Sequence, residues 1–348
     1  MTERTDDAPA KPESGLRPAS DGLPVTAADR LGLRLPAGLA DRLGELRSLS
    51  LLGVLVLLAI AGVATSGGRF LSVSNILNIL VSSSIIGVVV VGMTFVIIGG
   101  GIDLSVGGLV ALSSVWATTL ASQQLGAWAM VACALLVGMG AGLLNGLLIS
   151  VGRLVPFIVT LAMMVASRGL AEAMSGKKTQ LVTVDSINNI ATSDVFGIPV
   201  LVIIFAAVVL AGWILLNRTT FGRRTFAVGG NTEAARLAGI NVSRHTVLLY
   251  VLSGLCCGIA AIMLVSLTTT GSSTHGDLYE LDAIAAVIIG GTLLTGGKGT
   301  LVGSVLGALV FTTLTNIFVL NNLAIEVQNI AQGLIIIAAV LLQRRGTT

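Results

Sequence analysis

The chain is poor in charged and in aromatic side chains. Asp, Glu, Lys and Arg make up 11% of its 348 residues, and Phe, Trp and Tyr only 4%, whereas soluble domains carry about 25% charged residues. A soluble fold of this size would have too few polar side chains to cover its surface. This shortage excludes an ordinary soluble domain, and a net charge of +3 is too small to indicate binding of nucleic acid.

Cysteine and histidine are also scarce, with three and two residues. The cysteines lie inside apolar runs without ligand spacing, and the histidines fall in separate loops, so neither a disulfide framework nor a metal site is predicted. The glycine-rich run 290–300 does not fit the phosphate-binding P-loop, because Gly299 stands where Ser or Thr is required. No nucleophile and base stand at a recognisable spacing. We therefore expect no enzyme activity, no metal and no cofactor.

Long apolar blocks fill most of the chain, of which 54% is hydrophobic. A transmembrane helix needs about 20 apolar residues, so the blocks predict an all-α integral membrane protein with about ten such helices. The third, eighth and ninth blocks are short and are expected to start or stop within the membrane. The expected limits are 48–65, 79–98, 104–120, 127–150, 155–174, 199–216, 246–267, 281–294, 301–317 and 327–342.

The first 46 residues differ from the rest. They hold five of the seven prolines among Asp, Glu, Arg and Ser, which predicts a disordered tail ahead of a transmembrane domain over 47–345. The end of this segment, 37–48, has the composition of a short amphipathic helix on the membrane surface. With the N-terminus inside, most loop Lys and Arg residues fall on the cytoplasmic side, as the positive-inside rule requires, and both termini are expected to be cytoplasmic.

Glycines at four-residue spacing predict close packing of helices. They occur as Gly138, Gly142 and Gly146, as Gly254 with Gly258, and as Gly303 with Gly307. A short internal similarity also links IIGGGIDLSVGGLVAL (97–112) with IIGGTLLTGGKGTLVGSVLGAL (288–309). It is consistent with a duplicated half, as is common in transporters, but it is too short to establish one.

The longest inward loop, 217–245, carries five arginines. Asn231 is a good N-cap and Gly239 a good terminator, so a two-turn helix is predicted over 232–238. Gly229 and Gly230 are expected to break the chain before it. A helix this short is unstable alone in water, so it must dock on its own bundle, on lipid headgroups or on a partner, and these alternatives stay open.

That helix would be amphipathic and suitably charged. Glu233 lies near its positive end and Arg236 near its negative end, as the helix dipole favours. Ala234, Leu237 and Ala238 form a narrow apolar face.

A few polar residues interrupt the spans. Asp103 follows three glycines at the start of the third span, where it can cap that helix through the amide of Ser105 or Val106, or contribute to a translocation path or gate. Ser105, Asn145 and Asn316 are further candidates for the path, although asparagines within spans more commonly tie helices together.

Other charged residues lie near the outer ends of spans. Arg168 and Glu172, four residues apart, are expected to form an ion pair. Glu280 and Asp282 fall where a helix N-terminus favours carboxylates.

Four ordered motifs resemble one family. FGRRTFAVGGNTEAARLAGI (221–240) is similar to the cytoplasmic loop of ribose-type ABC permeases, a family that includes xylose, galactose and inositol permeases. The same family is resembled by GMTFVIIGGGIDLSVG (92–107), PFIVTLAMMVASRGLA (156–171) and YELDAIAAVIIGGTLLTGGKGTLVGSVLGAL (279–309). The resemblance covers about residues 50–343 and omits the tail.

This resemblance implies a type II ABC importer-like bundle in a bacterial plasma membrane. It implies a permease homodimer, a cytoplasmic ATP-binding subunit and an extracytoplasmic sugar-binding protein. The segment 231–238 would be the coupling helix and Gly229 and Gly230 its entry turn, while Arg223 and Arg224 would contact the ATPase or membrane lipid. The implied coupling residues are Arg223, Arg224, Gly229, Gly230, Asn231, Glu233, Ala234, Arg236 and Leu237.

The expected function is therefore that of a permease subunit for a monosaccharide, powered by a separate ATPase. One alternative is an ion-coupled secondary transporter, which usually buries carboxylates near the midplane; Asp103 is the one candidate for such a role here. A non-transporting membrane scaffold is a second alternative, with little reason to keep a glycine-rich interior dotted with polar residues.

Overall fold

The computed structural model describes the backbone of residues 37–345 and the side chains of residues 50–337. Most of the predicted tail lies outside this part, and its last residues form the start of the first described helix. The chain divides into two compact units, Met1–Gly44 and Glu45–Thr348. The second unit contains every described helix that is long and apolar enough to span a membrane.

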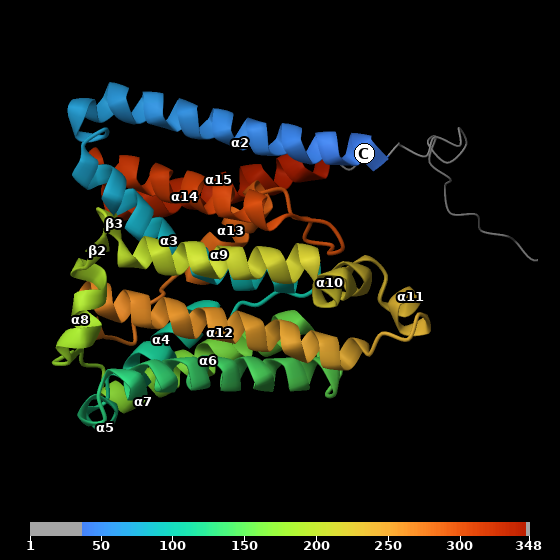
Figure 1. Ribbon diagram of the computed structural model, residues 1–348, viewed down its shortest axis with the longest axis horizontal. Helices are drawn as coiled ribbons and strands as arrows, with labels where there is room; N and C mark the ends of the chain where they lie inside the picture. The colour runs from blue at the N-terminus through green and yellow to red at the C-terminus, as the bar shows by residue number, and fades with distance from the viewer. Residues whose placement is uncertain (1–36, 346–348) are drawn as a thin grey trace, which may run out of the picture. The chain divides into compact units, whose positions relative to one another are not determined.

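Helices make up most of the described chain (Figure 1). The helices are α2 (Ala37–Ser66), η1 (Gly67–Arg69), α3 (Val73–Ile98), α4 (Val106–Ala117), α5 (Leu120–Gln124), α6 (Ala127–Ser150), α7 (Pro156–Ser175), α8 (Asp185–Thr192), α9 (Val200–Arg218), α10 (Thr220–Gly230), α11 (Thr232–Leu237), α12 (Val242–Thr268), α13 (Tyr279–Ile289), α14 (Leu301–Leu320) and α15 (Ile325–Arg345). Four two-residue strands complete the order: β1 (Gln180–Leu181), β2 (Asp194–Val195), β3 (Ile198–Pro199) and β4 (Thr270–Gly271).

Within the described residues, seven helices have the length and composition of a membrane span. The other three predicted spans correspond to α4, α13 and α15. The prediction that the third and eighth spans are short is confirmed, since α4 has 12 residues and α13 has 11. The prediction for the ninth span was wrong, because α14 has 20 residues and qualifies as a full span.

The polar residues of α14 lie inside the helix and find hydrogen-bond partners there. Thr312 and Thr315 donate to the carbonyl oxygens of Ala308 and Phe311, four residues earlier. Such bonds satisfy a hydroxyl within the helix. The polar residues within 312–316 therefore do not end the helix, and α14 continues to Leu320.

Helix α13 ends five residues before its predicted limit. Its end has the same hydrogen bond and the same left-handed glycine as the end of α3. Gly290 caps α13, and the amide of Thr292 donates to Val287, 3.2 Å away. After α3, the amide of Gly101 donates to Val96 at 2.9 Å. In each case the second glycine of the IIGG sequence has a left-handed φ, +84° at Gly100 and +87° at Gly291. The similar segments thus fold into the same helix-ending turn.

Helix α3 forms the centre of the bundle. Of the 18-residue apolar stretch of α3, 89% is buried, whereas in the corresponding stretch of α9 only 17% is buried. A helix that is apolar all round belongs inside a protein or in lipid, and here the two cases occur side by side. Helix α3 is enclosed by other helices, whereas α9 exposes apolar side chains such as Leu210 and Ile214.

Helices α6 and α12 pack through their glycines, as the spacing predicts. A Cβ on Gly138 would overlap the carbonyl oxygen of Gly254, and a Cβ on Gly254 would overlap that of Gly138. The second glycine pair, Gly303 with Gly307, brings α14 equally close to α13. These contacts confirm the small-residue faces and bring backbones together where side chains would keep them apart.

The two ends of the bundle are built differently. At one end lie α5, α8 and the short β2–β3 hairpin, and α10 and α11 project at the other (Figure 1). Strand β1 pairs antiparallel with β4, which ties the segment after α7 to the end of α12. The predicted long inward loop therefore forms a structured appendage at one end.

Candidate functional site

Helix α10 was missed by the sequence analysis, which expected an irregular entry into the short helix. The Thr219 side chain accepts a hydrogen bond from the amide of Gly222 and caps α10. One face is buried at Gly222, Thr225 and Val228. This spacing of three residues is a helical signal in the sequence that could have revealed α10.

A histidine anchors α10 to α12. The Thr225 hydroxyl and Nε2 of His245 are hydrogen-bonded at 3.0 Å, and both residues are buried. The ring of Phe221 lies 4.7 Å from that of His245, centroid to centroid. Arg223 and Arg224, on the other side of α10, are exposed. The helix therefore packs on the bundle by one face and presents two guanidinium groups to the outside.

Gly229 and Gly230 do not break the chain, contrary to the expectation; they are the last two residues of α10. The physical reason is packing. A Cβ on Gly229 would overlap the carbonyl oxygen of Ile98 and lie 2.8 Å from the amide nitrogen of Gly297. Glycine is required here so that the backbone of α10 can touch two other segments.

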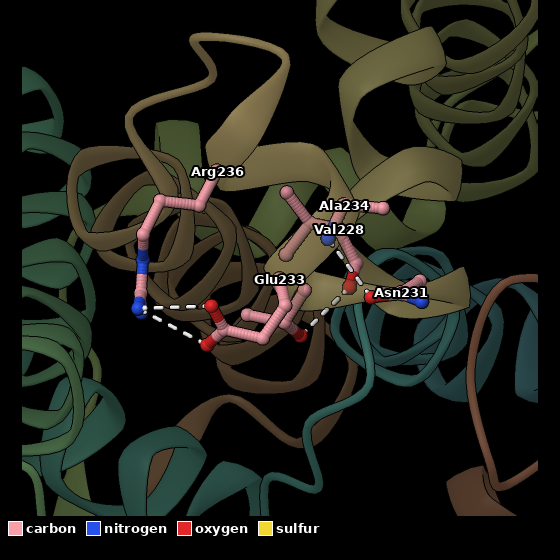
Figure 2. Close-up of polar contacts among 6 residues, drawn as sticks. Val228, Asn231, Glu233, Ala234 and Arg236 are labelled. Atoms are coloured by element: carbon pink, nitrogen blue, oxygen red, sulfur yellow. Dashed lines mark hydrogen bonds and ion pairs between the residues drawn. The ribbon is translucent and has the colours of Figure 1, made fainter.

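Helix α11 begins at the predicted cap. The Asn231 side chain accepts from the amide of Ala234 at 2.9 Å, and Glu233 and Arg236 form an ion pair at 3.0 Å (Figure 2). The Thr232 hydroxyl donates to the carbonyl oxygen of Val228 at 3.0 Å. The helix ends at Leu237, one residue before the predicted limit, and Gly239 follows with φ +81°.

The apolar face predicted for α11 is exposed. Ala234, Leu237 and Ala238 all face outward, and Leu237 is 89% exposed. Ala235 is the buried residue of this helix, 4% exposed. Helix α11 thus contacts its own bundle through Ala235 and leaves a second apolar face uncovered, with charged side chains beside it.

An open pocket of about 970 Å³ lies beside α11. The α6–α7 connection contributes Arg153 to its wall, α11 contributes Arg236, and the first turns of α12 contribute Ser243 and Thr246. The exposed surface at this end is therefore concave and basic next to the α11 helix.

Three of the four residues predicted for a path or gate lie together inside the bundle. Oδ1 of Asp103 accepts from the amide of Ser105 at 3.0 Å and from its hydroxyl, and Oδ2 accepts from the Ser253 hydroxyl at 2.8 Å. The Asn145 amide donates to the Ser105 hydroxyl at 2.9 Å. Asp103, Ser105 and Asn145 are 0% exposed and Ser253 is 1% exposed. We call these four residues the buried polar network.

The buried polar network joins three parts of the fold. Asp103 and Ser105 lie in the α3–α4 connection, Asn145 in α6 and Ser253 in α12. The hydroxyl of Tyr250, one turn before Ser253, donates to the carbonyl oxygen of Ile102. The expected bond from the Ser105 amide to Asp103 is confirmed, although the N-cap of α4 is Ser105 itself.

Sequence reasoning missed Ser253, a member of the network, and Tyr250, which bonds the chain next to Asp103. Serine and tyrosine are ordinary inside a membrane helix, and nothing in the local sequence distinguishes these two. Only the packing of α12 against the α3–α4 connection brings them to Asp103.

Asn316 lies apart from this network. Its side-chain amide and that of Asn75 form two reciprocal hydrogen bonds, at 2.9 and 3.0 Å. The Asn75 amide also donates to the carbonyl oxygen of Phe70. The pair ties α14 to the start of α3, which is the helix-tying alternative considered for this residue.

The predicted ion pair between Arg168 and Glu172 was wrong. Arg168 donates to the carbonyl oxygen of Ser273 at 3.0 Å and lies 3.5 Å from the Asp277 carboxylate. Glu172 pairs instead with Lys177 at 3.5 Å. The loop before α13 comes close to α7 and offers Arg168 a carbonyl and a carboxylate together, which a single residue on its own helix cannot match.

The carboxylates of α13 lie in its first turn, as expected, where the helix dipole favours negative charge. Glu280 is 9% exposed, and its Oε2 lies in contact distance of the backbone at Gly107. A Cβ on Gly107 would overlap both the Glu280 carboxylate and the backbone carbonyl oxygen of Gly276, so glycine is favoured at this contact.

A bundle of membrane-spanning helices, with a structured charged appendage at one end and a polar network in its interior, defines a multi-pass membrane protein of the transporter class. The chain belongs to the family described as branched-chain amino acid transport system / permease component, whose model matches residues 75–340.

Curated relatives match most of the chain. The ribose import permease protein RbsC of Escherichia coli (strain K12) is 39% identical over 308 residues, which cover 85% of this chain and 93% of the relative. RbsC of Bacillus subtilis (strain 168) is 39% identical over 84% of this chain and 91% of the relative. The L-arabinose transport system permease protein AraH of Escherichia coli (strain K12) is 36% identical, with coverage of 84% and 90%. No solved structure matches significantly.

Proposed function

We propose that this chain is the permease subunit of a binding-protein-dependent ABC importer for a monosaccharide, with a ribose-like sugar as the first candidate. The family and the names of the relatives support the class of substrate. The permease supplies the translocation path. A separate cytoplasmic ATP-binding subunit supplies energy, and an extracytoplasmic sugar-binding protein delivers the sugar.

The observation that carries this proposal is the uncovered face of α11. A six-residue helix does not fold alone in water. Here the Asn231 side chain caps α11, and its buried residue, Ala235, packs it on the bundle. Its opposite face exposes Ala234 and Leu237. Small apolar side chains with charged neighbours suit a groove in another protein. We assign α11 as the coupling helix and the ATP-binding subunit as the protein that receives it.

The basic residues near α11 supply the polar rim of this contact. Arg223 and Arg224 project from α10, and Arg236 is paired with Glu233 on α11. Acidic side chains of the ATP-binding subunit, or phosphates of membrane lipid, would meet the two α10 guanidinium groups. Gly229 and Gly230 let α10 end against the bundle immediately before α11 starts.

The orientation in a bacterial inner membrane follows from charge. The α10–α11 end of the bundle also carries Arg153, which shares a pocket with Arg236, and Lys298, next to the Gly297 contact with α10. The other end carries Lys177 and Lys178 after α7. Loops rich in Lys and Arg stay in the cytoplasm, so we place α10 and α11 inside the cell, together with both termini.

For the translocation path itself we propose an indirect role for the buried polar network. All four members are buried within one subunit, and both Asp103 oxygens are hydrogen-bonded. Asp103, Ser105 and Asn145 therefore hold the α3–α4 connection in place beside the path, and the Asn75–Asn316 pair holds α14. A homodimer of permeases, as the family resemblance implies, would form the path between subunits.

Reconstitution in liposomes tests the proposal. We expect uptake of a radiolabelled sugar, with D-ribose and L-arabinose as the probes, only when ATP, the ATP-binding subunit and the binding protein are all present. Omission of any one of the three is the matched control. Uptake by the purified chain alone under a proton or sodium gradient would contradict the proposal and favour a secondary transporter.

A further inference from the structure

The C-terminal end of α10 meets two loops through backbone alone. Four glycines form this contact, and we call them the glycine junction: Gly100, Gly229, Gly296 and Gly297. The amide of Gly297 donates to the carbonyl oxygen of Ile98 at 2.8 Å. Added Cβ atoms at Gly229 and Gly296 would fall within 3 Å of neighbouring backbone atoms. The nearest atoms at all four glycines are backbone atoms, which cannot absorb a relative shift by changing rotamer.

The two loops at the glycine junction are the helix-ending turns with similar sequence. The first, 99–105, leads from α3 to α4 and carries Asp103 and Ser105 of the buried polar network. The second, 290–300, leads from α13 to α14 and ends at Thr300, whose side chain caps α14. The end of α10 therefore touches the loops that begin two different helices of the bundle.

Both loops contain glycines in the left-handed region, and the first loop is also bonded to α12. Gly100, Gly296 and Gly297 have φ angles of +84°, +82° and +72°, which non-glycine residues rarely adopt. Ahead of α4, the Asp103 carboxylate is bonded to Ser253 of α12. A shift of α10 against Ile98 thus moves a connection whose far side is fixed to α12.

We propose that the glycine junction is the joint through which movement of α10 and α11 reaches α4 and α14. This inference rests on the proposed function, since it assumes that a motor moves α11. It assigns Gly229 a positioning role, because its backbone contacts Ile98 and Gly297 directly. The buried polar network holds the α3–α4 connection to α12. The residues of this connection are therefore expected to move together.

The first test substitutes Gly229→Ala in the complete importer reconstituted in liposomes. The new methyl group forces the end of α10 away from Ile98 while leaving the exposed face of α11 unchanged. We expect normal co-purification of the ATP-binding subunit, continued ATP hydrolysis, and about a tenfold loss of sugar taken up per ATP, within the usual range for coupling between sites.

Two further variants serve for comparison. Gly230→Ala adds its methyl group 3.9 Å from the Cα of Gly297, an ordinary contact, and should lose less uptake per ATP than Gly229→Ala. Gly140→Ala, in α6, has open space around its Cβ and should match the unsubstituted protein. Equal uptake per ATP in Gly229→Ala and the unsubstituted protein would overturn the inference, as would equal losses in all three variants.

A second measurement needs no substitution and decides the case if Gly229→Ala does not fold. Hydrogen exchange is followed in the unsubstituted complex with ATP and with ADP. We expect the exchange of 99–105 and 291–299 to change together with that of 220–238. A change in 220–238 without one in the two loops would overturn the joint and leave the proposed function standing. No change in any of the three segments would contradict the proposed function itself.

Discussion

The buried polar network and the α10–α11 appendage differ in which side chains they bury: the first buries polar groups, and the second exposes both charged and apolar ones. Around Asp103, donors from α12 and the α3–α4 connection converge on one buried carboxylate. Asn145 of α6 donates to the Ser105 hydroxyl beside it. On α11, the charged pair Glu233–Arg236 is exposed and an apolar face beside it is uncovered. The interior pairs both oxygens of its buried carboxylate within the subunit, whereas the appendage leaves apolar surface for another molecule.

This difference teaches how to separate structural from interaction residues in a membrane bundle. A polar residue whose partners all come from its own subunit stabilises that subunit, because an unsatisfied polar group inside it is costly. An exposed apolar face outside the membrane has no lipid to cover it and marks a contact with a partner. Substitutions should therefore lower stability in the first region and assembly in the second.

The largest effect should come from Asp103→Ala. The substitution leaves the Ser105 amide, the Ser105 hydroxyl and the Ser253 hydroxyl without their acceptor. Because each buried donor left unsatisfied costs about 1–3 kcal/mol, we expect the free energy of unfolding in detergent to fall by about 3 kcal/mol or more. Denaturation of the purified permease measures this change.

Two controls sharpen that prediction. Asp103→Asn keeps one carbonyl acceptor and should lose less stability than Asp103→Ala. Asp185→Ala removes an exposed carboxylate and should change the free energy of unfolding by less than about 0.5 kcal/mol. If Asp103→Ala and Asp185→Ala have equal free energies of unfolding, the buried polar network does not stabilise the subunit, and the contrast with the appendage is wrong.

Ala234→Arg tests the other region. A long charged side chain on the exposed face of α11 prevents a groove from closing over it, and we expect the affinity for the ATP-binding subunit to fall by at least about 2 kcal/mol. The unfolding of the isolated permease should not change. Co-purification with a tagged ATP-binding subunit gives the readout, and Ala121→Arg, exposed on α5 at the opposite end, is the matched control. Normal assembly of the Ala234→Arg variant with the ATP-binding subunit would show that α11 does not lie in the interface.

Gly138→Ala probes the interior again, with a smaller expected effect. The methyl group meets the carbonyl oxygen of Gly254 and pushes α6 from α12, and such overpacking costs about 1–3 kcal/mol. Gly140→Ala lies two residues along the same helix in open space and should be neutral or slightly stabilising. The two variants are compared by denaturation in detergent. If they unfold alike, the glycine contact between α6 and α12 is not tight.

Asn231→Ala should have the smallest effect. It removes the side-chain oxygen that accepts from the Ala234 amide, and loss of such a cap costs about 1 kcal/mol in helix stability. We expect faster hydrogen exchange across α11 and weaker ATPase binding, with the melting of the bundle unchanged. Asn231→Asp keeps the acceptor and should restore slow exchange. Unchanged exchange in Asn231→Ala would mean that tertiary contacts alone hold α11.

Several features of the fold followed from local sequence. The apolar blocks located the spans, because lipid demands continuous apolar helices of a set length. The α11 cap, the Glu233–Arg236 arrangement and the end at Gly239 followed from helix-capping chemistry, which acts within a few residues. The close approach of α6 and α12 was signalled by glycines four residues apart.

Other features could not be predicted because their partners lie far along the chain. Arg168 was assigned to Glu172 on its own helix, yet the loop before α13 supplies its partner, 109 residues away at Asp277. Asn316 was considered for the translocation path because its partner on α3, Asn75, lies 241 residues earlier in the chain. Gly229 and Gly230 indicated a chain break, yet α10 runs through both, and the backbones of Ile98 and Gly297 explain why glycine is needed at Gly229.

Sequence by itself determined that this protein is a helical membrane bundle with a capped short helix in an arginine-rich loop. Both properties depend on interactions within about 20 residues, such as burial of an apolar run in lipid and capping of a helix end. Tertiary structure alone decided that Asp103, Ser105 and Asn145 meet Ser253, that Asn316 does not join them, and that α10 ends on two similar loops. These contacts depend on how helices pack, and packing is settled by the shapes of surfaces that no local stretch of sequence contains.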